Sequence, residues 1–408
     1  MRTVFLLVSL LISLFCLSPA NADTCDQNKI AIQQKKVLTD FADKALKDKG
    51  SLGGITAIGM VIQRGEGTPV SLYEGVNGLG DNTAINASSI FQIGSITKSF
   101  IAVVILQLAE EDKFSIDDPK LLGKYFPEYP NWSGITLRQL MNMTSGIPGN
   151  ENELPDDIFK KFTRAEYTHY ISSTKLLNLT YALPVHFKPG TSFEYSNTNY
   201  ILLGELIQRI THHSPEDEVK KRIIEKLGLK NTYFAIDTEQ KIPGIKPSQI
   251  VHGYNTTPAT SHPYSFMHFG EDITDFSLSE YGAQGAMVST PEDINNYVHA
   301  LYHPGLLLNQ DQINQFTKKL VSMEDGTPFN PTKDLKDPRG FGFGIVGYYW
   351  QSQGRFLYLY NGQTDGFNFA YVYDPKTQQY LTFAVNTQGY GLVTIANLLS
   401  LLTDLNQS

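Results

Sequence analysis

The sequence is poor in cysteine and has no excess of basic residues. Only two of its 408 residues are cysteine, and Cys16 lies inside an apolar N-terminal run, which leaves Cys25 without an internal partner. We therefore expect no disulfide. Lysine and arginine number 33 against 41 aspartates and glutamates, for a formal net charge of −8. Because nucleic-acid-binding surfaces need a basic excess, nucleic acid is not an expected partner.

The N-terminal apolar run is too short to span a membrane. Residues 4–17 form a run of 14 residues, VFLLVSLLISLFCL, whereas a membrane-spanning helix needs roughly 20. The run follows Arg2 and precedes the A-x-A pattern of residues 20–22, as is typical of a cleaved secretory signal. We expect residues 1–22 to be removed, no stable membrane anchor to remain, and the protein to be periplasmic or secreted in a bacterium.

Motifs of metal sites and of α/β-hydrolases are missing. The sequence has no H-E-x-x-H, no compact cysteine spacing and no G-x-S-x-G. We interpret His212 and His213 as the end of a helix. His262 and His268 lie among aromatic residues and are interpreted as loop residues near a cleft instead of zinc ligands. No metal and no cofactor are expected.

Residue periodicity predicts strands at both ends of the chain and helices between them. This order indicates an α+β fold in which both chain ends, about 23–94 and 295–408, build one sheet, and 95–294 form an inserted, mainly helical part. Residues 149–157 and 255–275 are candidate lid loops, or ordinary surface loops. The segments behind these expectations are a helix over 40–49, a strand within 54–65, strands within 341–350, 355–360, 367–374 and 380–387, and a closing helix within 392–405.

The sequence GSITK places Ser95 and Lys98 three residues apart at the start of a long apolar segment. On a helix both side chains would share one face, and the helix N-terminus would favour negative charge on the serine oxygen. A neutral lysine can take the proton from a serine, so no His-Asp pair is needed. The alternative is that Ser95 is an ordinary helix N-cap.

A second S-x-x-K and a polar tripeptide help to decide between these alternatives. Ser172 and Lys175 have the same spacing but no glycine junction and no long apolar helix after them, so we interpret Ser172 as an ordinary helix or loop residue. Tyr195 and Asn197, in FEYSNTNY, precede another apolar helix. A tyrosine can relay a proton, and an asparagine can orient a lysine and bind a substrate carbonyl.

Four segments together resemble the superfamily of serine β-lactamases and D-alanyl-D-alanine carboxypeptidases, in its class C and DD-peptidase branch, which also contains esterases. The resemblance implies an antiparallel sheet flanked by helices, with a helical subdomain beside it. It also implies that Ser95 is the nucleophile, Lys98 its activating amine, Tyr195 the proton shuttle and Asn197 a contact of the lysine and the substrate. The segments are FQIGSITKSFIAVVILQLAEEDKFSIDDP, ITLRQLMNMTSGIP, PGTSFEYSNTNYILLGELI and GAQGAMVSTPEDINNYVHAL.

The third element of this superfamily, usually Lys-Thr-Gly or His-x-Gly, is altered. Tyr360, Asn361 and Gly362 occupy the triplet, and a tyrosine is uncharged at neutral pH. A substrate carboxylate would therefore lack its usual cation here. Gly362 allows close approach of a substrate, and the N–H of Gln363 is expected to form an oxyanion hole with that of Ser95.

Three functions from different classes agree with these features. The expected one is a hydrolase of D-amino-acid peptides, with D-alanyl-D-alanine carboxypeptidase or β-lactamase activity. The alternatives are an esterase or amidase of the same superfamily, and a catalytically silent penicillin-binding-like protein. The expected partner is a small peptide, β-lactam or ester substrate, and Asn150, in the first candidate lid loop, is a further candidate substrate contact.

Overall fold

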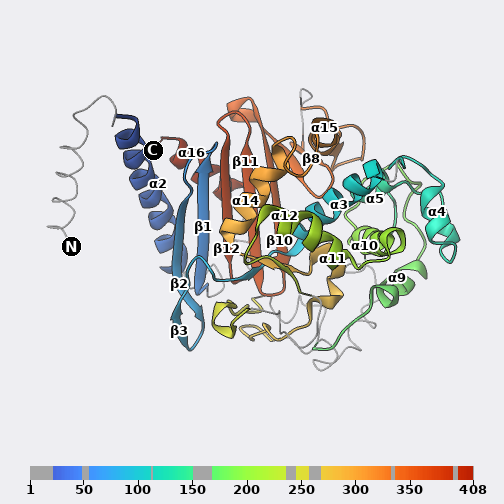
Figure 1. Cartoon of the computed structure of the whole chain (residues 1–408), viewed down its shortest axis with the longest axis horizontal. Coiled ribbons are helices and arrows are strands. Elements are labelled where there is room, and N and C mark those ends of the chain that lie inside the picture. Colours follow the sequence, from blue (N-terminus) through green and yellow to red (C-terminus); the bar gives the residue numbers. More distant parts are fainter. Residues whose placement is uncertain are drawn as a thin grey trace.

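A nine-stranded antiparallel sheet forms the centre of this computed structural model, which describes residues 22–47, 55–111, 114–149, 168–235, 245–256, 268–331, 336–388 and 394–407 (Figure 1). The strand order is β3-β2-β1-β12-β11-β10-β9-β8-β7, so β1 pairs with β12 and both ends of the chain share one sheet. The strands are β1 (Ala57–Arg64), β2 (Val70–Gly78), β3 (Asp81–Ala84), β7 (Val321–Ser322), β8 (Arg339–Phe341), β9 (Val346–Trp350), β10 (Arg355–Thr364), β11 (Phe367–Asp374) and β12 (Gln379–Val385).

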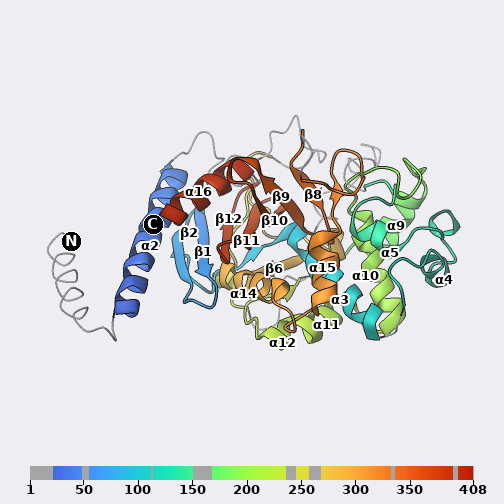
Figure 2. The same ribbon diagram turned by 90° about the horizontal axis from the view of Figure 1, so that it is seen from above.

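Helices cover the two faces of this sheet. Two neighbouring residues of β12 each contact a different helical layer, because successive side chains of a strand point to opposite faces. Phe383 packs edge-on against Phe41 of α2 (Ala22–Lys47), and α16 (Ile395–Gln407) lies beside α2. Thr382 donates a hydrogen bond to the carbonyl of Pro291 in α14 (Pro291–Tyr302), on the other face. Figure 2 shows the two layers from above.

The predicted α+β fold is confirmed, and most predicted elements are found. The aromatic segments form β8 to β12, residues 57–64 form β1, and the closing helix is α16. The helix predicted over 40–49 is longer, since α2 begins at Ala22. Strands β2 and β3 were not predicted; β2 alternates apolar residues with serine, glutamate and asparagine, which weakens its apolar signal.

The middle of the chain supplies most of the remaining helices and a small sheet. Strand β6 lies between β4 and β5 in this second sheet. We had predicted a mainly helical part without this sheet, because its strands are only two or three residues long and give little sequence signal. The elements are β4 (Phe91–Gln92), α3 (Thr97–Glu111), α4 (Leu121–Tyr125), α5 (Leu137–Met141), α9 (Ser173–Tyr181), α10 (Thr198–Thr211), α11 (Pro215–Val219), a π-helix (Lys220–Ile224), α12 (Glu225–Leu227), β5 (Tyr233–Phe234), α13 (Gly282–Gly285), β6 (Met287–Ser289) and α15 (Gln310–Lys318).

The histidines interpreted as a helix end do lie at one. His212 is the C-cap of α10, with a left-handed φ of 61°, and His213 hydrogen-bonds Glu218 at 2.9 Å. His268 is exposed, and its backbone N–H donates to Glu271. His262 lies outside the described residues. None of the described helices has both the length and the apolarity to cross a membrane.

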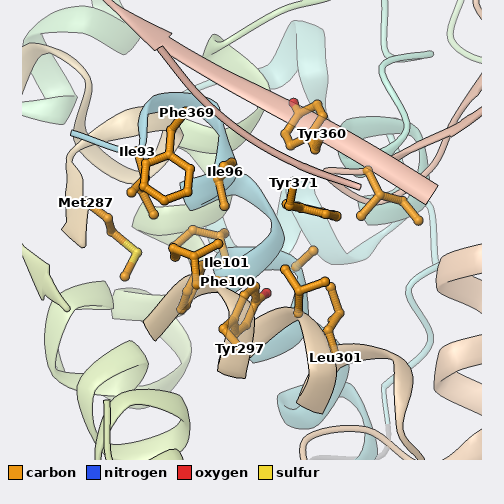
Figure 3. Close-up of a cluster of buried hydrophobic side chains, with 14 of the residues drawn as sticks. Ile93, Ile96, Phe100, Ile101, Met287, Tyr297, Leu301, Tyr360, Phe369 and Tyr371 are labelled. Carbon is orange, nitrogen blue, oxygen red and sulfur yellow. The ribbon is translucent and has the colours of Figure 1, made fainter. Parts of the chain in front are cut away.

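Helix α3 is buried between the main sheet and the other helices. Its apolar residues point in every direction, as expected for a helix inside a core. Phe100 stacks on Tyr297 of α14 with ring centroids 3.7 Å apart, and the Tyr297 hydroxyl donates to Ser99 Oγ at 2.9 Å. Figure 3 shows this cluster, in which Tyr360 and Tyr371 of the sheet face α3 and α14. The core therefore fixes the first turn of α3 against β10 and β11.

The packing of Phe383 between β12 and α2 allows a first test. Phe383 is fully buried, so Phe383→Ala removes apolar contacts and leaves a cavity that costs about 3–5 kcal/mol of unfolding free energy. Urea unfolding followed by circular dichroism measures this loss. Leu79→Ala is the control, because Leu79 is 66% exposed. Equal stability of the two variants would contradict the packing described here.

Candidate active site

A 3₁₀ turn, Gly94–Ile96, leads into α3 and places Ser95 against the backbone of β10. The turn begins at Gly94, whose φ of +49° favours glycine. A Cβ added to Gly94 would lie 2.6 Å from the backbone nitrogen of Gln363, so a larger residue does not fit. The backbone N–H of Ile93 donates to the Met287 carbonyl of β6 at 3.0 Å. Ser95 is thus held between the two sheets, with its side chain half-buried.

Lys98 lies one helical turn after Ser95 and is completely buried. Its Nζ donates to Ser95 Oγ at 2.9 Å and to the carbonyl of Gln284 at 2.8 Å, and it lies 3.5 Å from Oε1 of the same glutamine. The ring centroid of Tyr195 is 5.1 Å from Nζ. Burial opposes a positive charge on this amine, whereas the hydrogen bonds and the ring contact favour one; in its neutral form the amine could take a proton from Ser95.

Tyr195 reaches Ser95 from the loop before α10. Its hydroxyl is hydrogen-bonded to Ser95 Oγ at 2.8 Å. The segment MTSGIP holds this loop in place: the Met143 carbonyl accepts the Glu194 N–H at 3.0 Å, and Ser196 Oγ donates to the Pro148 carbonyl at 3.0 Å. Ser95, Lys98 and Tyr195 are therefore brought together as predicted, from two helix starts separated by about a hundred residues.

Tyr360 lies beside Tyr195, and its described hydrogen bond goes to that neutral side chain. The two hydroxyl groups are 3.3 Å apart, and the ring of Phe341 packs edge-on against both tyrosine rings. Tyr360 is 3% exposed, and this burial raises its pKa well above the usual value, with Tyr195 raising it further. No described lysine or arginine donates a hydrogen bond to its hydroxyl. The position that usually carries a cation is neutral in this protein.

Asn197 is the N-cap of α10 and is 7% exposed. Among the described residues, its Oδ1 is buried without a hydrogen-bond partner. We expected Asn197 to contact Lys98, but the described hydrogen bonds of Lys98 go to Ser95 and Gln284 instead. A buried acceptor without a donor costs about 1–3 kcal/mol. The amide oxygen of Asn197 has thus lost its hydration without a compensating hydrogen bond among the described residues.

Gly362 and Gln363 bring the backbone of β10 next to the amide of Ser95. A Cβ on Gly362 would lie 1.8 Å from the Ile93 carbonyl oxygen and 2.8 Å from the backbone nitrogen of Ser95. Only glycine allows this approach. Together with the contact between Gly94 and the nitrogen of Gln363, this places the two predicted oxyanion donors on facing backbone segments.

Asn361 is the described predicted contact that the structure does not bring to Ser95. Asn361 is exposed and pairs with Ala370 of β11. Because side chains alternate along a strand, it points to the face opposite to that of Tyr360. Asn150 lies outside the described residues, as do 151–157 of the first candidate lid loop and 257–267 of the second.

The sequence did not reveal Gln284 and Met143, which hold Lys98 and the Tyr195 loop in place, whereas the second S-x-x-K at Ser172 was interpreted correctly as an ordinary helix residue. Gln284 holds Lys98 through a backbone carbonyl, a contact that any residue type could make, so no side-chain signal pointed to it. Met143 has a left-handed φ of 65°, which its sequence context did not indicate. Ser172 caps α9 by accepting the Lys175 N–H at 3.3 Å, as expected for an ordinary helix residue.

A family model described as Beta-lactamase matches residues 42–404. The chain belongs to the β-lactamase family. This family of serine hydrolases was the predicted one, and the match covers the whole described sheet and the site around Ser95.

Curated relatives of this β-lactamase family member are longer proteins. Protein flp of Staphylococcus aureus is 27% identical over 76% of this chain and 53% of its own length. Beta-lactamase-like protein 2 of Dictyostelium discoideum is 25% identical over 80% of this chain and 58% of its own length. The chain thus spans about half the length of the curated relatives it matches.

Solved structures of similar fold include enzymes named for D-amino-acid substrates. The D-amino acid amidase of Ochrobactrum anthropi SV3 has a TM-score of 0.72 at 22% identity, covering 94% of this chain and 98% of its own. A D-stereospecific amidohydrolase of Streptomyces sp. has 0.69 at 24% identity, covering 86% and 94%. The D-alanine carboxypeptidase AmpC of Burkholderia cenocepacia has 0.66 at 16% identity, covering 92% and 99%. These likenesses establish the fold.

The close approach of Gly362 to Ser95 leads to a second prediction. Gly362→Ala pushes β10 away from the turn of Ser95 and separates the two oxyanion donors, so ester hydrolysis should fall about a hundredfold or more. Gly134→Ala is the control, since nothing lies within 4 Å of a Cβ there. Unchanged hydrolysis by a folded Gly362→Ala protein would show that β10 supplies no part of the site.

Lys98 provides a third prediction. Lys98→Met keeps an unbranched side chain of similar length but removes the amine, and steady-state hydrolysis should fall by about two to four orders of magnitude. Lys175→Met in the second S-x-x-K is the matched control and should leave the rate unchanged. A near-normal rate for Lys98→Met would transfer the role of base to Tyr195.

Proposed function

We propose that this protein is a serine hydrolase that forms an acyl-enzyme at Ser95 and cleaves amides or esters of D-amino acids and short D-amino-acid peptides. The observation that carries the proposal is that Ser95 Oγ contacts Lys98 Nζ at 2.9 Å and the Tyr195 hydroxyl at 2.8 Å. A hydroxyl between a buried amine and a phenol is arranged to lose its proton and to attack a carbonyl carbon. No metal or cofactor takes part in the proposed reaction.

Acylation starts with transfer of the Ser95 proton to the neutral amine of Lys98. Oγ then forms a bond to the substrate carbonyl carbon, and the carbonyl oxygen becomes an oxyanion held by the N–H groups of Ser95 and Gln363. Tyr195 gives its proton to the leaving nitrogen or oxygen as the bond to carbon breaks. The lysine returns its extra proton to the tyrosine, and the acyl group remains on Ser95.

Deacylation repeats these transfers with water as the nucleophile. The neutral amine of Lys98 takes a proton from a water molecule, either directly or through Tyr195, which then passes its own proton to the amine. The hydroxide adds to the acyl carbon, and the same two N–H groups hold the second oxyanion. When the intermediate collapses, Ser95 Oγ leaves and regains a proton. The net reaction adds one water to the amide or ester, and both general acid-base groups return to their starting states.

The neutral Tyr360 supports a substrate without a free carboxylate at this position. A carboxylate placed beside a buried, uncharged phenol would lose its hydration without gaining a cation. The sequence favoured carboxypeptidase or β-lactamase activity, and both types of substrate carry a free carboxylate. The hydrogen bond between Tyr360 and Tyr195 therefore favours the alternative from the sequence, an amidase or esterase.

The Oδ1 of Asn197 is buried without a hydrogen-bond partner among the described residues, and a substrate N–H would satisfy it if binding turns this amide towards the substrate. An amino-acid amide or a peptide offers such a donor, whereas a simple alkyl ester does not. The preference for the D configuration is supported by the names of the similar structures, which are a D-amino acid amidase, a D-stereospecific amidohydrolase and a D-alanine carboxypeptidase.

Export is a second part of the proposal and rests on residues 1–22 alone. A basic residue, a short apolar run and an A-x-A ending are the features of a cleaved secretory signal. Exported D-amino-acid hydrolases meet cell-wall fragments and other extracellular D-peptides. Cleavage after Ala22 and a bacterial periplasmic or secreted location are checked by N-terminal sequencing of the protein recovered outside the cytoplasm.

A substrate panel tests the proposed function and gives a fourth prediction. The panel contains D-phenylalanine amide, L-phenylalanine amide, a D-Ala-D-Ala peptide, a chromogenic cephalosporin and p-nitrophenyl acetate, with Ser95→Ala as the blank. We expect the D-amide and the simple ester to be hydrolysed, and the two carboxylate substrates to react at least about tenfold more slowly in kcat/KM, the size of one lost charge-assisted hydrogen bond.

Asn197→Ala refines the same test. It should lower kcat/KM for D-phenylalanine amide by about tenfold, because one hydrogen bond to the substrate N–H is lost, and should leave p-nitrophenyl acetate nearly unaffected. Efficient hydrolysis of the peptide or the cephalosporin would restore the carboxypeptidase or β-lactamase alternative. Absence of turnover on every substrate would favour the catalytically silent alternative.

A further inference from the structure

Two histidines and one glutamate converge at the end of the main sheet that lies beside the turn between β1 and β2. His299 and His303 are four residues apart on the last turn of α14 and just after it, and Glu66 lies in the turn. One ligand atom from each residue lies within 4.8 Å of the other two. Residues four apart on a helix share one face, so the topology brings both imidazoles to Glu66.

We propose that Glu66, His299 and His303 form a binding site for a single divalent zinc ion, separate from the site at Ser95. Imidazole and carboxylate groups suit Zn²⁺, which takes four ligands in a tetrahedral arrangement. Three would come from the protein and the fourth from water. The site goes beyond the proposed hydrolase function and does not depend on it.

The hydrogen bonds of His303 orient it for this role. Its Nδ1 lies 2.7 Å from the carbonyl oxygen of His299, and because a carbonyl can only accept, Nδ1 carries the proton and donates it. This tautomer leaves the lone pair on Nε2, which lies 3.9 Å from Glu66 Oε1. A backbone carbonyl that fixes the second ring nitrogen is the usual support of a metal-binding histidine.

His299 is hydrogen-bonded to Glu66, with Nε2 3.0 Å from Glu66 Oε1. A metal ion bound to both atoms would replace the proton of this hydrogen bond. The rings of His299 and His303 stack with centroids 4.0 Å apart, and Tyr380 of β12 packs against His299 at 5.3 Å. The aromatic contacts restrict both rings before any ion binds, which lowers the entropy lost on binding.

The third ligand can adjust to the ion. Tetrahedral zinc with bonds of about 2.0–2.1 Å needs roughly 3.4 Å between ligand atoms, so Glu66 Oε1 must move slightly away from His299 Nε2, which is now 3.0 Å distant, and towards His303 Nε2, which is now 3.9 Å distant. Glu66 can make this movement, because its side chain is 81% exposed, whereas those of His299 and His303 are 16% and 32% exposed. The stacked imidazole rings would turn slightly so that both lone pairs meet at the ion, and the exposed glutamate would complete the site.

Ion binding would fasten the end of α14 to the β1–β2 turn. That turn is also tied to the next hairpin, since the backbone N–H of Gly65 donates to the Gln378 carbonyl at 2.8 Å. The start of α14 directly follows β6, the strand whose Met287 carbonyl accepts the backbone N–H of Ile93 near Ser95. His299 is farther from this strand, roughly 12 Å along the helix axis from Pro291. The ion would therefore stabilise the sheet without touching the catalytic groups.

Calorimetric titration of the untagged full chain with Zn²⁺ tests this site, together with thermal unfolding with and without the ion. We expect one ion per chain and a rise in Tm, because an ion that binds only the folded state stabilises it. The double variant His299→Ala/His303→Ala should lose both effects. Glu66→Gln should bind Zn²⁺ about tenfold more weakly or worse, and His169→Ala/His268→Ala should behave as the unchanged protein.

The titration distinguishes the site from an ordinary ion pair. Absence of binding by the unchanged protein at millimolar Zn²⁺ would show that Glu66 and His299 form only a hydrogen-bonded pair. Equal affinity of the unchanged protein and the His299→Ala/His303→Ala variant would place the ion elsewhere. If that double variant fails to fold, Glu66→Gln on the exposed turn provides the test instead. Binding of Zn²⁺ by Glu66→Gln with the affinity of the unchanged protein would overturn the proposal.

Discussion

The close contact between strand β10 and the turn that begins α3 is the constraint on which the candidate site depends. Gly94 and Gly362 let two backbone segments meet at a distance that no Cβ could tolerate. This contact aligns the amides of Ser95 and Gln363, and it also places Tyr360 of β10 beside Tyr195. The central sheet, built from both chain ends, and the buried helix α3 serve to hold these two segments against each other.

Burial determines the electrostatics of the site. Lys98 is enclosed by a serine hydroxyl, a backbone carbonyl and two tyrosine rings, and its complete burial opposes the positive charge that these contacts favour. Burial keeps Tyr360 neutral by raising its pKa. The usual carboxylate-binding cation is therefore replaced by a phenol that hydrogen-bonds Tyr195. This replacement links the fold to the proposed preference for amides and esters.

Much of the fold and the centre of the site could be predicted from the sequence, because each depends on local patterns. Strand segments rich in aromatic residues and the spacing of Ser95 and Lys98 are visible without coordinates. Contacts made by backbone atoms are not, which is why Gln284, whose carbonyl accepts from Lys98, was missed. The zinc ligand Glu66 is distant in sequence from His299, and only the sheet topology brings them together.

Intact-mass measurement after reaction with a serine-directed fluorophosphonate tests whether Ser95 is the nucleophile. We expect one adduct per chain, located at Ser95 by peptide mapping, and no adduct on Ser95→Ala. Because the nucleophile depends on the buried amine, Lys98→Met should label far more slowly than Lys175→Met. Equal labelling of the unchanged protein and Ser95→Ala would contradict the assignment of Ser95 as the nucleophile.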